Sequence, residues 1–288
     1  MITDKAKLKD IIQAVAGREG FPVILVEKDY YLTIVLNAIG PILSDKLVFK
    51  GGTLLNKSIL NYHRLSEDLD FTYLGKLETK AKRSQAMAAI KEKLPELLKA
   101  VRLTSDDPKG SGYNNSTQYV FNIQYQSLFS AARGTIKLEI SLRQSPILPP
   151  VYKELRHLFK DPFTGEDLIS RPSVLSLVTA EAVAEKLKAA VSRQDAAIRD
   201  FYDLAHIDAS DFNFLDDDFI QLFKKKLFDE KYQGNFRVNF GLSEQALADL
   251  KRQINTDLIP VLRAGDSFDF GAVITRFNEI FNAPKFKD

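Results

Sequence analysis

The chain has no cysteine among its 288 residues, and this absence excludes several kinds of site. Without thiols there is no disulfide, no zinc site built on thiolates and no cysteine nucleophile. A reducing compartment suits such a chain, so we expect a cytoplasmic location. Histidine is also scarce: His63, His157 and His206 lack the spacing of metal ligands, and we predict no zinc site.

Long apolar runs and a strong charge bias are missing too. No stretch approaches the roughly 18 apolar residues of a membrane span, and the N-terminus, MITDKAKLKD, has no apolar signal region. We therefore expect a soluble protein without a membrane partner. The net charge is only +2, so any contact with nucleic acid requires a local patch. Residues 224–226 with Lys231 and Arg237 are one candidate strip, or else solvated helix faces.

What the chain does contain is typical of a globular α+β protein. It has 45% hydrophobic and 27% charged residues, and its length allows two modest domains. Adjacent prolines at 149 and 150 predict a boundary between domains 1–148 and 149–288. Periodicity predicts a mixed sheet flanked by helices in the first domain, and a mainly α-helical second domain with a loop at 171–176. Expected helices are 5–16, 27–39, 79–101, 179–195 and 198–207, and expected strands are 47–49, 68–74, 117–127 and 134–144.

Three carboxylates fall on polar strand positions. Asp68 and Asp70 are two residues apart on a predicted strand, so both side chains point to the same face. Two carboxylates with water and nucleotide phosphates suit Mg²⁺, with Mn²⁺ as the other candidate. Glu139 lies on the polar side of a later strand, where it would complete a metal site or act as a base. A D-x-D pair also occurs at ordinary solvated strand ends, so the pair alone does not establish a metal site.

A glycine turn stands before the acidic strand. Gly51, Gly52 and Thr53 separate a predicted strand from a predicted helix, so their backbone N–H groups could receive a phosphate at the helix N-terminus. Lys50 and Arg64 flank the turn and the acidic strand, where each would hold phosphate or pair with Glu67; we favour Lys50 for phosphate. An ordinary tight turn explains the glycines equally well.

The order of these motifs resembles the AbiEii/AbiGii-type toxins, a branch of the DNA polymerase β-like nucleotidyltransferases. The matching residues are Lys50, Gly51, Gly52, Thr53 and Leu55, followed by Arg64, Ser66, Glu67, Asp68 and Asp70. Two further blocks agree: residues 27–30 read E-K-D-Y, and residues 185–204 contain E-K-L-K-A, an arginine and R-D-F-Y-D-L. The resemblance implies a nucleotidyltransferase-type sheet with a nucleoside triphosphate as substrate, and Arg64 and Ser66 as part of the nucleotide site.

Basic residues of the second domain extend the predicted site. Lys186 and Arg193 are seven apart on a predicted helix and so share a face, where their natural partner would be a triphosphate. Asp203, with Asp200, would orient them by ion pairing. A salt bridge with a purely structural role explains the same residues.

The resemblance implies transfer of a nucleoside monophosphate to an acceptor hydroxyl. The implied acceptor is RNA, such as a tRNA 3′ end, and the implied partner is an antitoxin protein that neutralises the chain as a toxin in bacterial defence. The alternatives are phosphoryl transfer to a protein or small molecule, and a non-catalytic module that binds nucleotide or RNA. The three intact carboxylates argue against the non-catalytic alternative.

Overall fold

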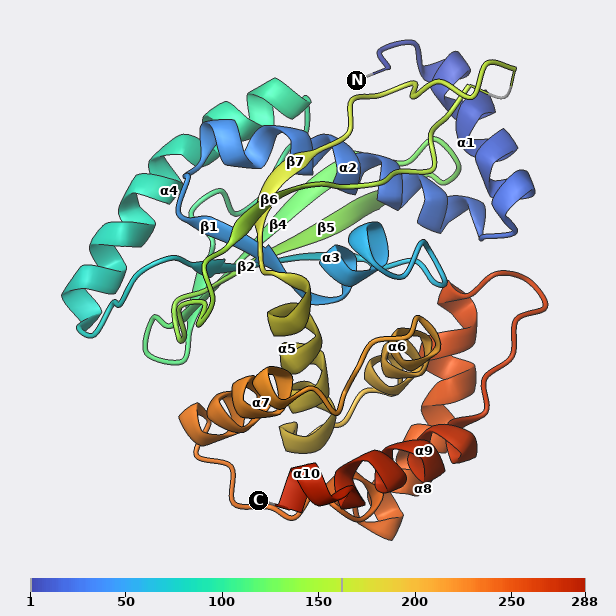
Figure 1. Ribbon diagram of the computed structural model, residues 1–288. Coiled ribbons are helices and arrows are strands. Elements are labelled where there is room, and N and C mark those ends of the chain that lie inside the picture. The colour runs from blue at the N-terminus through green and yellow to red at the C-terminus, as the bar shows by residue number, and fades with distance from the viewer. Residues whose placement is uncertain (1, 162, 288) are drawn as a thin grey trace. The chain divides into compact units, whose positions relative to one another are not determined.

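A computed structural model describes residues 2–161 and 163–287 of the protein (Figure 1). The chain divides into two compact units, Met1–Leu177 and Val178–Asp288, which we call unit 1 and unit 2. The predicted α+β class is confirmed, because the described part of unit 1 holds a mixed sheet with helices and that of unit 2 is helical.

Unit 1 is built on a seven-stranded sheet with the order β3-β4-β5-β2-β1-β7-β6. The strands are β1 Leu47–Lys50, β2 Asp68–Tyr73, β3 Ser111–Tyr113, β4 Gln118–Gln126, β5 Arg133–Ser141, β6 Val151–Glu154 and β7 Ser173–Ser176. The central strand β2 runs parallel to β5 and antiparallel to β1. The start of β2 therefore lies between the middle of β5 and the end of β1.

The two faces of the central sheet differ sharply in polarity. Along β4 and β5 almost every second side chain is buried, as the alternating sequence predicts. The buried face of β2 and β5 includes Leu69, Phe71, Leu138 and Ile140, all fully inaccessible to solvent. Hydrophobic burial thus fixes the strand register, because a slip of one residue would turn these side chains toward water. The same register places the acidic side chains together on the opposite face.

The helices in the described part of unit 1 are α1 Lys5–Glu19, α2 Val23–Ile42, α3 Gly51–Ser58 and α4 Lys80–Val101. The predicted helices at 5–16, 27–39 and 79–101 are all present, with small shifts at their ends. Helix α2 carries apolar residues on most of its surface because it contacts α1, α4 and the sheet, and Figure 1 shows it running across the strands. The glycine turn leads directly into α3.

The chain between residues 149 and 177 differs from the prediction. Residues 171–176 were expected to form a loop, but Ser173–Ser176 is strand β7, which pairs with β6 and, at Phe49 and Ser176, with β1. The division between the units accordingly follows Leu177 and not residue 148. The two prolines precede an edge strand, a position that tolerates proline because the outer side needs no ladder hydrogen bonds.

Unit 2 consists of helices around a core of phenylalanine rings. Its α-helices are α5 Thr179–Ser192, α6 Ile198–Ala209, α7 Asp217–Asp229, α8 Glu244–Gln253, α9 Phe270–Asn282 and α10 Pro284–Lys287, with short helical turns at Asn239–Gly241, Ile254–Leu258 and Ile259–Val261. Phe201, Phe240, Phe277 and Phe281 are fully buried, and their rings contact one another in edge-to-face and tilted arrangements. Such ring pairs stabilise the core beyond simple burial of area.

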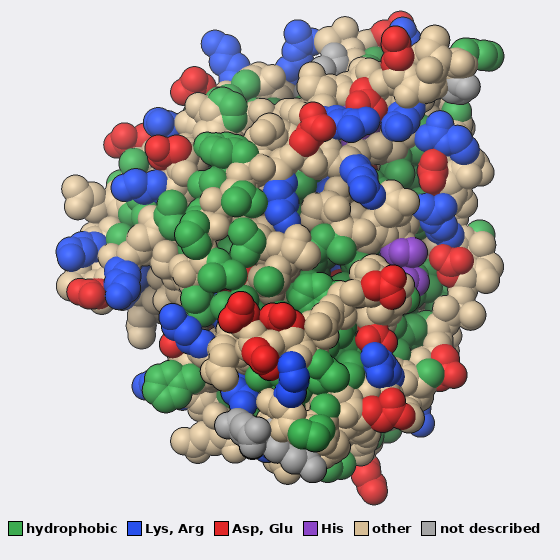
Figure 2. Space-filling view, viewed as in Figure 1, with side chains coloured by type: hydrophobic (Ala, Val, Ile, Leu, Met, Phe, Trp, Pro, Cys, Tyr) green, Lys and Arg blue, Asp and Glu red, His purple; other side chains and the backbone are tan. Residues whose placement is uncertain are grey.

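The candidate basic strip at residues 224–226, Lys231 and Arg237 is not continuous. Lys226 is 2% exposed and bonds Glu181 and Glu185 of α5, each at 2.6 Å. Arg237 donates to the carbonyl of Phe286. The helix interrupts the strip, because consecutive lysines on a helix point in different directions and one of them faces the core. The visible face in Figure 2 likewise shows Lys and Arg interspersed with Asp and Glu.

Candidate active site

The three predicted carboxylates occupy one face of two neighbouring strands. Asp68 and Asp70 begin β2 on its more open side. Asp70 is paired in register with Glu139 of β5 on one side and with Lys50 of β1 on the other. Asp68 stands opposite Lys137 of β5. The strand pairing therefore brings together acids that are about seventy residues apart in the sequence.

The pKa of Asp70 departs from that of a free carboxyl group. Burial raises the pKa of Asp70 to about 6; Lys50 opposes this shift, and the negative charges of Glu139 and Asp68 add to it. Burial destabilises the anionic form of this acid, and a positive ion placed beside it would offset that penalty. The electrostatics thus favour a bound cation at the start of β2.

Lys137 is a member of this cluster that the sequence analysis did not select. Its ammonium Nζ lies 2.8 Å from Glu139 Oε2. Burial alone would lower the pKa of Lys137, but the hydrogen bond and charge of Glu139, aided by Asp68 and Asp70, raise it. Strand periodicity places Lys137 and Glu139 on one face, so the signal was present in the sequence.

The donor set fits a hard cation held by two protein carboxylates. Mg²⁺ commonly takes one or two carboxylates and completes its octahedron with water and phosphate oxygens. Asp68 and Asp70 supply that pair. Among the described residues, no three Asp, Glu or His side chains are grouped so as to hold a metal ion, and Glu139 is engaged by Lys137. Its role as a third ligand or base stays a prediction.

The glycine turn is packed directly against the acidic strand. Gly51 has φ +79°, a left-handed conformation that side chains disfavour, and a Cβ there would overlap the Asp70 carboxylate. At Gly52 a Cβ would lie 2.9 Å from Arg64 Nη2 and 3.3 Å from Ser66 Oγ. Gly51 is therefore required for the close approach of the turn to Asp70, which an ordinary tight turn does not demand, whereas a side chain at Gly52 would mainly displace the flexible end of Arg64.

Thr53 and Arg64 lie next to the glycine turn. The Thr53 hydroxyl donates to the carbonyl of Asp68 and lies 2.8 Å from Ser66 Oγ, so it ties α3 to β2. Arg64 is 4% exposed, and its Nη1 donates to the carbonyl of Leu65. Lys50, the N-cap residue of α3, makes no side-chain cap. The N-terminal N–H groups of α3 and the Lys50 ammonium are thus the groups suited to an anion.

The E-K-D-Y segment of α2 supports this arrangement and does not add a ligand to it. Lys28 Nζ bonds Glu67 Oε2 at 3.2 Å, directly before Asp68. Asp29 Oδ1 accepts from the fully buried Lys57 of α3 at 2.6 Å, and the same ammonium also bonds Tyr62 and Thr33. These contacts anchor α3 and the entry to β2 on helix α2.

The selected residues of unit 2 form a cluster of their own. Lys186 Nζ on α5 lies 2.7 Å from Asp200 and 2.8 Å from Asp203, both on α6, and Arg193 bonds Asp200 at 2.8 Å. The ion pairs that would orient these bases are present, and their role in binding a triphosphate stays a prediction. Lys186 is 8% exposed, whereas half of the Arg193 side chain is open.

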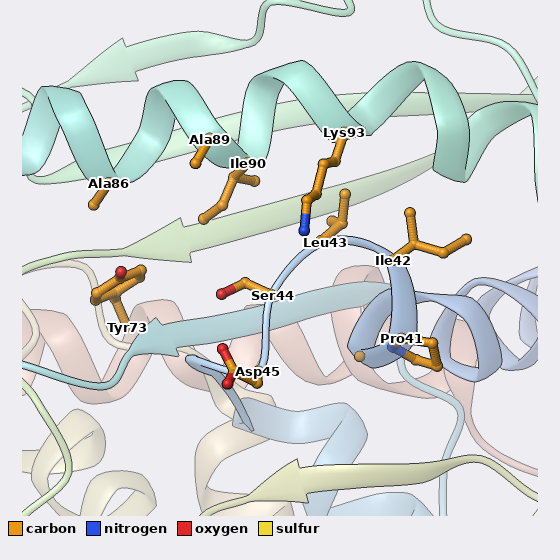
Figure 3. Close-up of a pocket in the computed structure, with 11 residues that line it drawn as sticks. Pro41, Ile42, Leu43, Ser44, Asp45, Tyr73, Ala86, Ala89, Ile90 and Lys93 are labelled. Carbon is orange, nitrogen blue, oxygen red and sulfur yellow. The ribbon is translucent and has the colours of Figure 1, made fainter.

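A surface pocket lies at the other end of β2. It has a volume of about 350 Å³ between the end of α2, Tyr73 of β2 and helix α4. Figure 3 shows Lys93 reaching from α4 over Ser44, with Asp45 nearby. Tyr73 ends the strand that Asp68 begins, so this pocket is separate from the carboxylates.

No helix in the described ranges is long and apolar enough to cross a membrane.

Comparison with known proteins assigns the chain to a family. A family model described as nucleotidyl transferase AbiEii toxin, type IV toxin–antitoxin system, matches residues 35–282. Among solved structures, the nucleotidyltransferase toxin MenT4 from Mycobacterium tuberculosis is similar at 19% identity and TM-score 0.64, over 100% of this chain and 90% of that one. JHP933 from Helicobacter pylori is similar at 16% identity and TM-score 0.50, over 93% and 94%. No curated protein matches the sequence. The match over residues 35–282 shows that the chain belongs to the AbiEii family of nucleotidyl transferase toxins.

Proposed function

We propose that the protein transfers a nucleoside monophosphate from a nucleoside triphosphate to an acceptor hydroxyl. The observation that carries this proposal is the packing of Gly51 against Asp70, on the strand face that also carries Asp68 and Glu139. In the reaction the acceptor oxygen attacks the α-phosphorus, the bond from that phosphorus to the bridging oxygen breaks, and pyrophosphate leaves. The hydroxyl proton passes to a base, for which Glu139 is the candidate.

Asp68 and Asp70 would hold Mg²⁺ or Mn²⁺ on the triphosphate. The cation would supply positive charge that neutralises the phosphates and the leaving pyrophosphate. The N–H groups of Gly52 and Thr53 and the Lys50 ammonium would bind phosphate oxygens at the start of α3. Arg64 and Ser66 would hold the turn in the shape that this requires.

Within unit 2, Lys186 and Arg193 are proposed as residues that bind phosphate groups. Positive groups fixed before the reaction stabilise negative charge as it develops, at no cost of reorganisation. Asp200 and Asp203 hold the Lys186 ammonium in one place. Arg193 is the more open of the two bases and is the better candidate for direct contact.

The acceptor is proposed to be RNA, such as the 3′ end of a tRNA, and the partner an antitoxin protein. Membership of a toxin–antitoxin family supports the partner. In that setting expression of the chain should arrest bacterial growth, whereas the Asp70→Ala variant should not. Equal arrest by both would exclude a toxicity that depends on this site.

The direct test uses purified protein, total RNA, Mg²⁺ and each nucleoside triphosphate in turn, labelled at either the α- or the γ-phosphate. Nucleotidyl transfer predicts α-label in RNA with the wild type and none with the Asp68→Ala/Asp70→Ala variant. Appearance of γ-label in an acceptor would instead identify phosphoryl transfer. Triphosphate binding without transfer of either label would favour a non-catalytic binding module.

A further inference from the structure

Lys137 occupies the acidic face of the sheet and makes an ion pair there. Its Nζ is 2.8 Å from Glu139 Oε2, and its backbone is in register with Asp68 on the adjacent strand. The lysine side chain is 42% exposed and the glutamate 21%. A partly exposed ion pair can exchange partners, because water hydrates each charged group when the contact between the two is lost.

The position of this lysine matters because three negative charges share the face. Asp70 carries the electrostatic effect of both Asp68 and Glu139. The Lys137 ammonium is a compact charge on a flexible four-carbon stem, so it can leave one anion for another without movement of the backbone. A divalent cation between the strands would attract the same Glu139 carboxylate that Lys137 now binds.

We propose that Lys137 is an exchangeable counter-ion that competes with the divalent cation for Glu139 and, once displaced, binds the phosphates of the nucleotide. This inference rests on the function proposed above and assigns a role to a residue outside the predicted site. It also explains why no three carboxylates among the described residues are arranged to hold a metal ion. Lys137 reduces the repulsion between the acidic side chains while no cation or nucleotide is bound.

Removal of the Lys137 charge should have two opposite effects: tighter binding of the cation and weaker binding of the nucleotide. In Lys137→Met the divalent cation no longer displaces an ammonium, so its affinity rises about two- to fivefold, the range expected for a half-exposed ion pair. Nucleotide binding in the presence of the cation becomes weaker, because one phosphate contact is lost. A lysine that acted only through its general positive charge would change cation affinity no more than a second positive charge removed from the same strand face.

The experiment measures Mn²⁺ binding to the full chain by the loss of the free-ion electron paramagnetic resonance signal. Arg133→Met is the matched control, because it removes a positive charge from the same face of β5, where Arg133 contacts Gln124 and Asp106. Lys137→Arg retains the charge. Binding two- to fivefold tighter in Lys137→Met alone, with weaker binding of a non-hydrolysable triphosphate at saturating Mn²⁺, is the expected result.

The outcomes separate this inference from the proposed function. Circular dichroism establishes that each variant is folded, and Asp70→Asn defines the Mn²⁺ binding that belongs to this site. Unchanged or weaker Mn²⁺ binding in folded Lys137→Met would overturn the counter-ion role and leave the proposed function intact. No Mn²⁺ binding to the wild type, with or without nucleotide, would overturn both.

Discussion

Replacement of Gly51 by alanine tests whether the glycine turn is part of the site. The residue has φ +79°, and a left-handed conformation costs an alanine roughly 1–2 kcal/mol. The added methyl group would also overlap the Asp70 carboxylate, and such overpacking costs roughly 1–3 kcal/mol. We expect a loss of about 2–5 kcal/mol in the free energy of unfolding, and displacement of Asp70 in the molecules that remain folded.

Two other glycines separate these contributions. Gly165 has φ +74° with nothing within 4 Å of the added Cβ, so Gly165→Ala has the conformational cost alone. Gly17 lies inside helix α1 with open space around it, so Gly17→Ala should stabilise by roughly 0.5–1 kcal/mol. The loss in Gly51→Ala beyond that in Gly165→Ala measures the contact with Asp70.

The assay is urea unfolding of the three variants, followed by triphosphate binding with Mg²⁺ under conditions where each is folded. We expect Gly51→Ala to lose binding and the two controls to retain it. Stability of Gly51→Ala equal to that of Gly165→Ala, together with wild-type binding of nucleotide, would refute the close packing of the turn on Asp70.

Three further predictions follow from buried charges. Because the folded pKa of Asp70 is raised to about 6, the folded state binds a proton more tightly than the unfolded state, and stability falls as pH rises from about 4 to 6. Asp70→Asn should remove up to about 3 kcal/mol of that dependence in urea unfolding at several pH values. Lys57→Met leaves Asp29 buried without its cation and should cost about 3–5 kcal/mol in thermal or urea unfolding. Lys226→Met should destabilise similarly whereas exposed Lys225→Met should not, and equal stability of the two would contradict the inward orientation of Lys226.

Periodic patterns made part of this structure predictable. Alternation along residues 134–144 fixed which side of β5 is buried, and therefore that Glu139 shares the polar face with Asp68 and Asp70. Helical spacing likewise placed Asp200 and Asp203 on one face of α6, and both bond Lys186 of α5. In both cases the regular backbone fixed the face on which a side chain lies, whereas the pairing of β2 with β5 and the contact of α5 with α6 join distant segments.

Features that depend on distant partners were not predictable in the same way. Strand β7 has four residues and is defined by its pairing with β6 and β1. The local sequence pattern does not include these partners, so it could not identify the strand. Lys226 resembled its two neighbours in sequence and is distinguished only by Glu181 and Glu185 on another helix. Lys137 lies on the polar face that the pattern predicted. Its bond engages Glu139, the same carboxylate that was predicted to be a third metal ligand.

Helix α3 is a short element that contacts at both of its ends hold in place beside Asp70. Eight residues in isolation do not form a stable helix, so its geometry comes from contacts at both ends. At the N-terminus, Thr53 bonds the carbonyl of Asp68 and ties the turn to β2. Near the C-terminus, the buried Lys57 bonds Asp29 and ties the helix to α2. Loss of either anchor would let the turn move relative to Asp70, so residues far from any phosphate contribute to the geometry of the site.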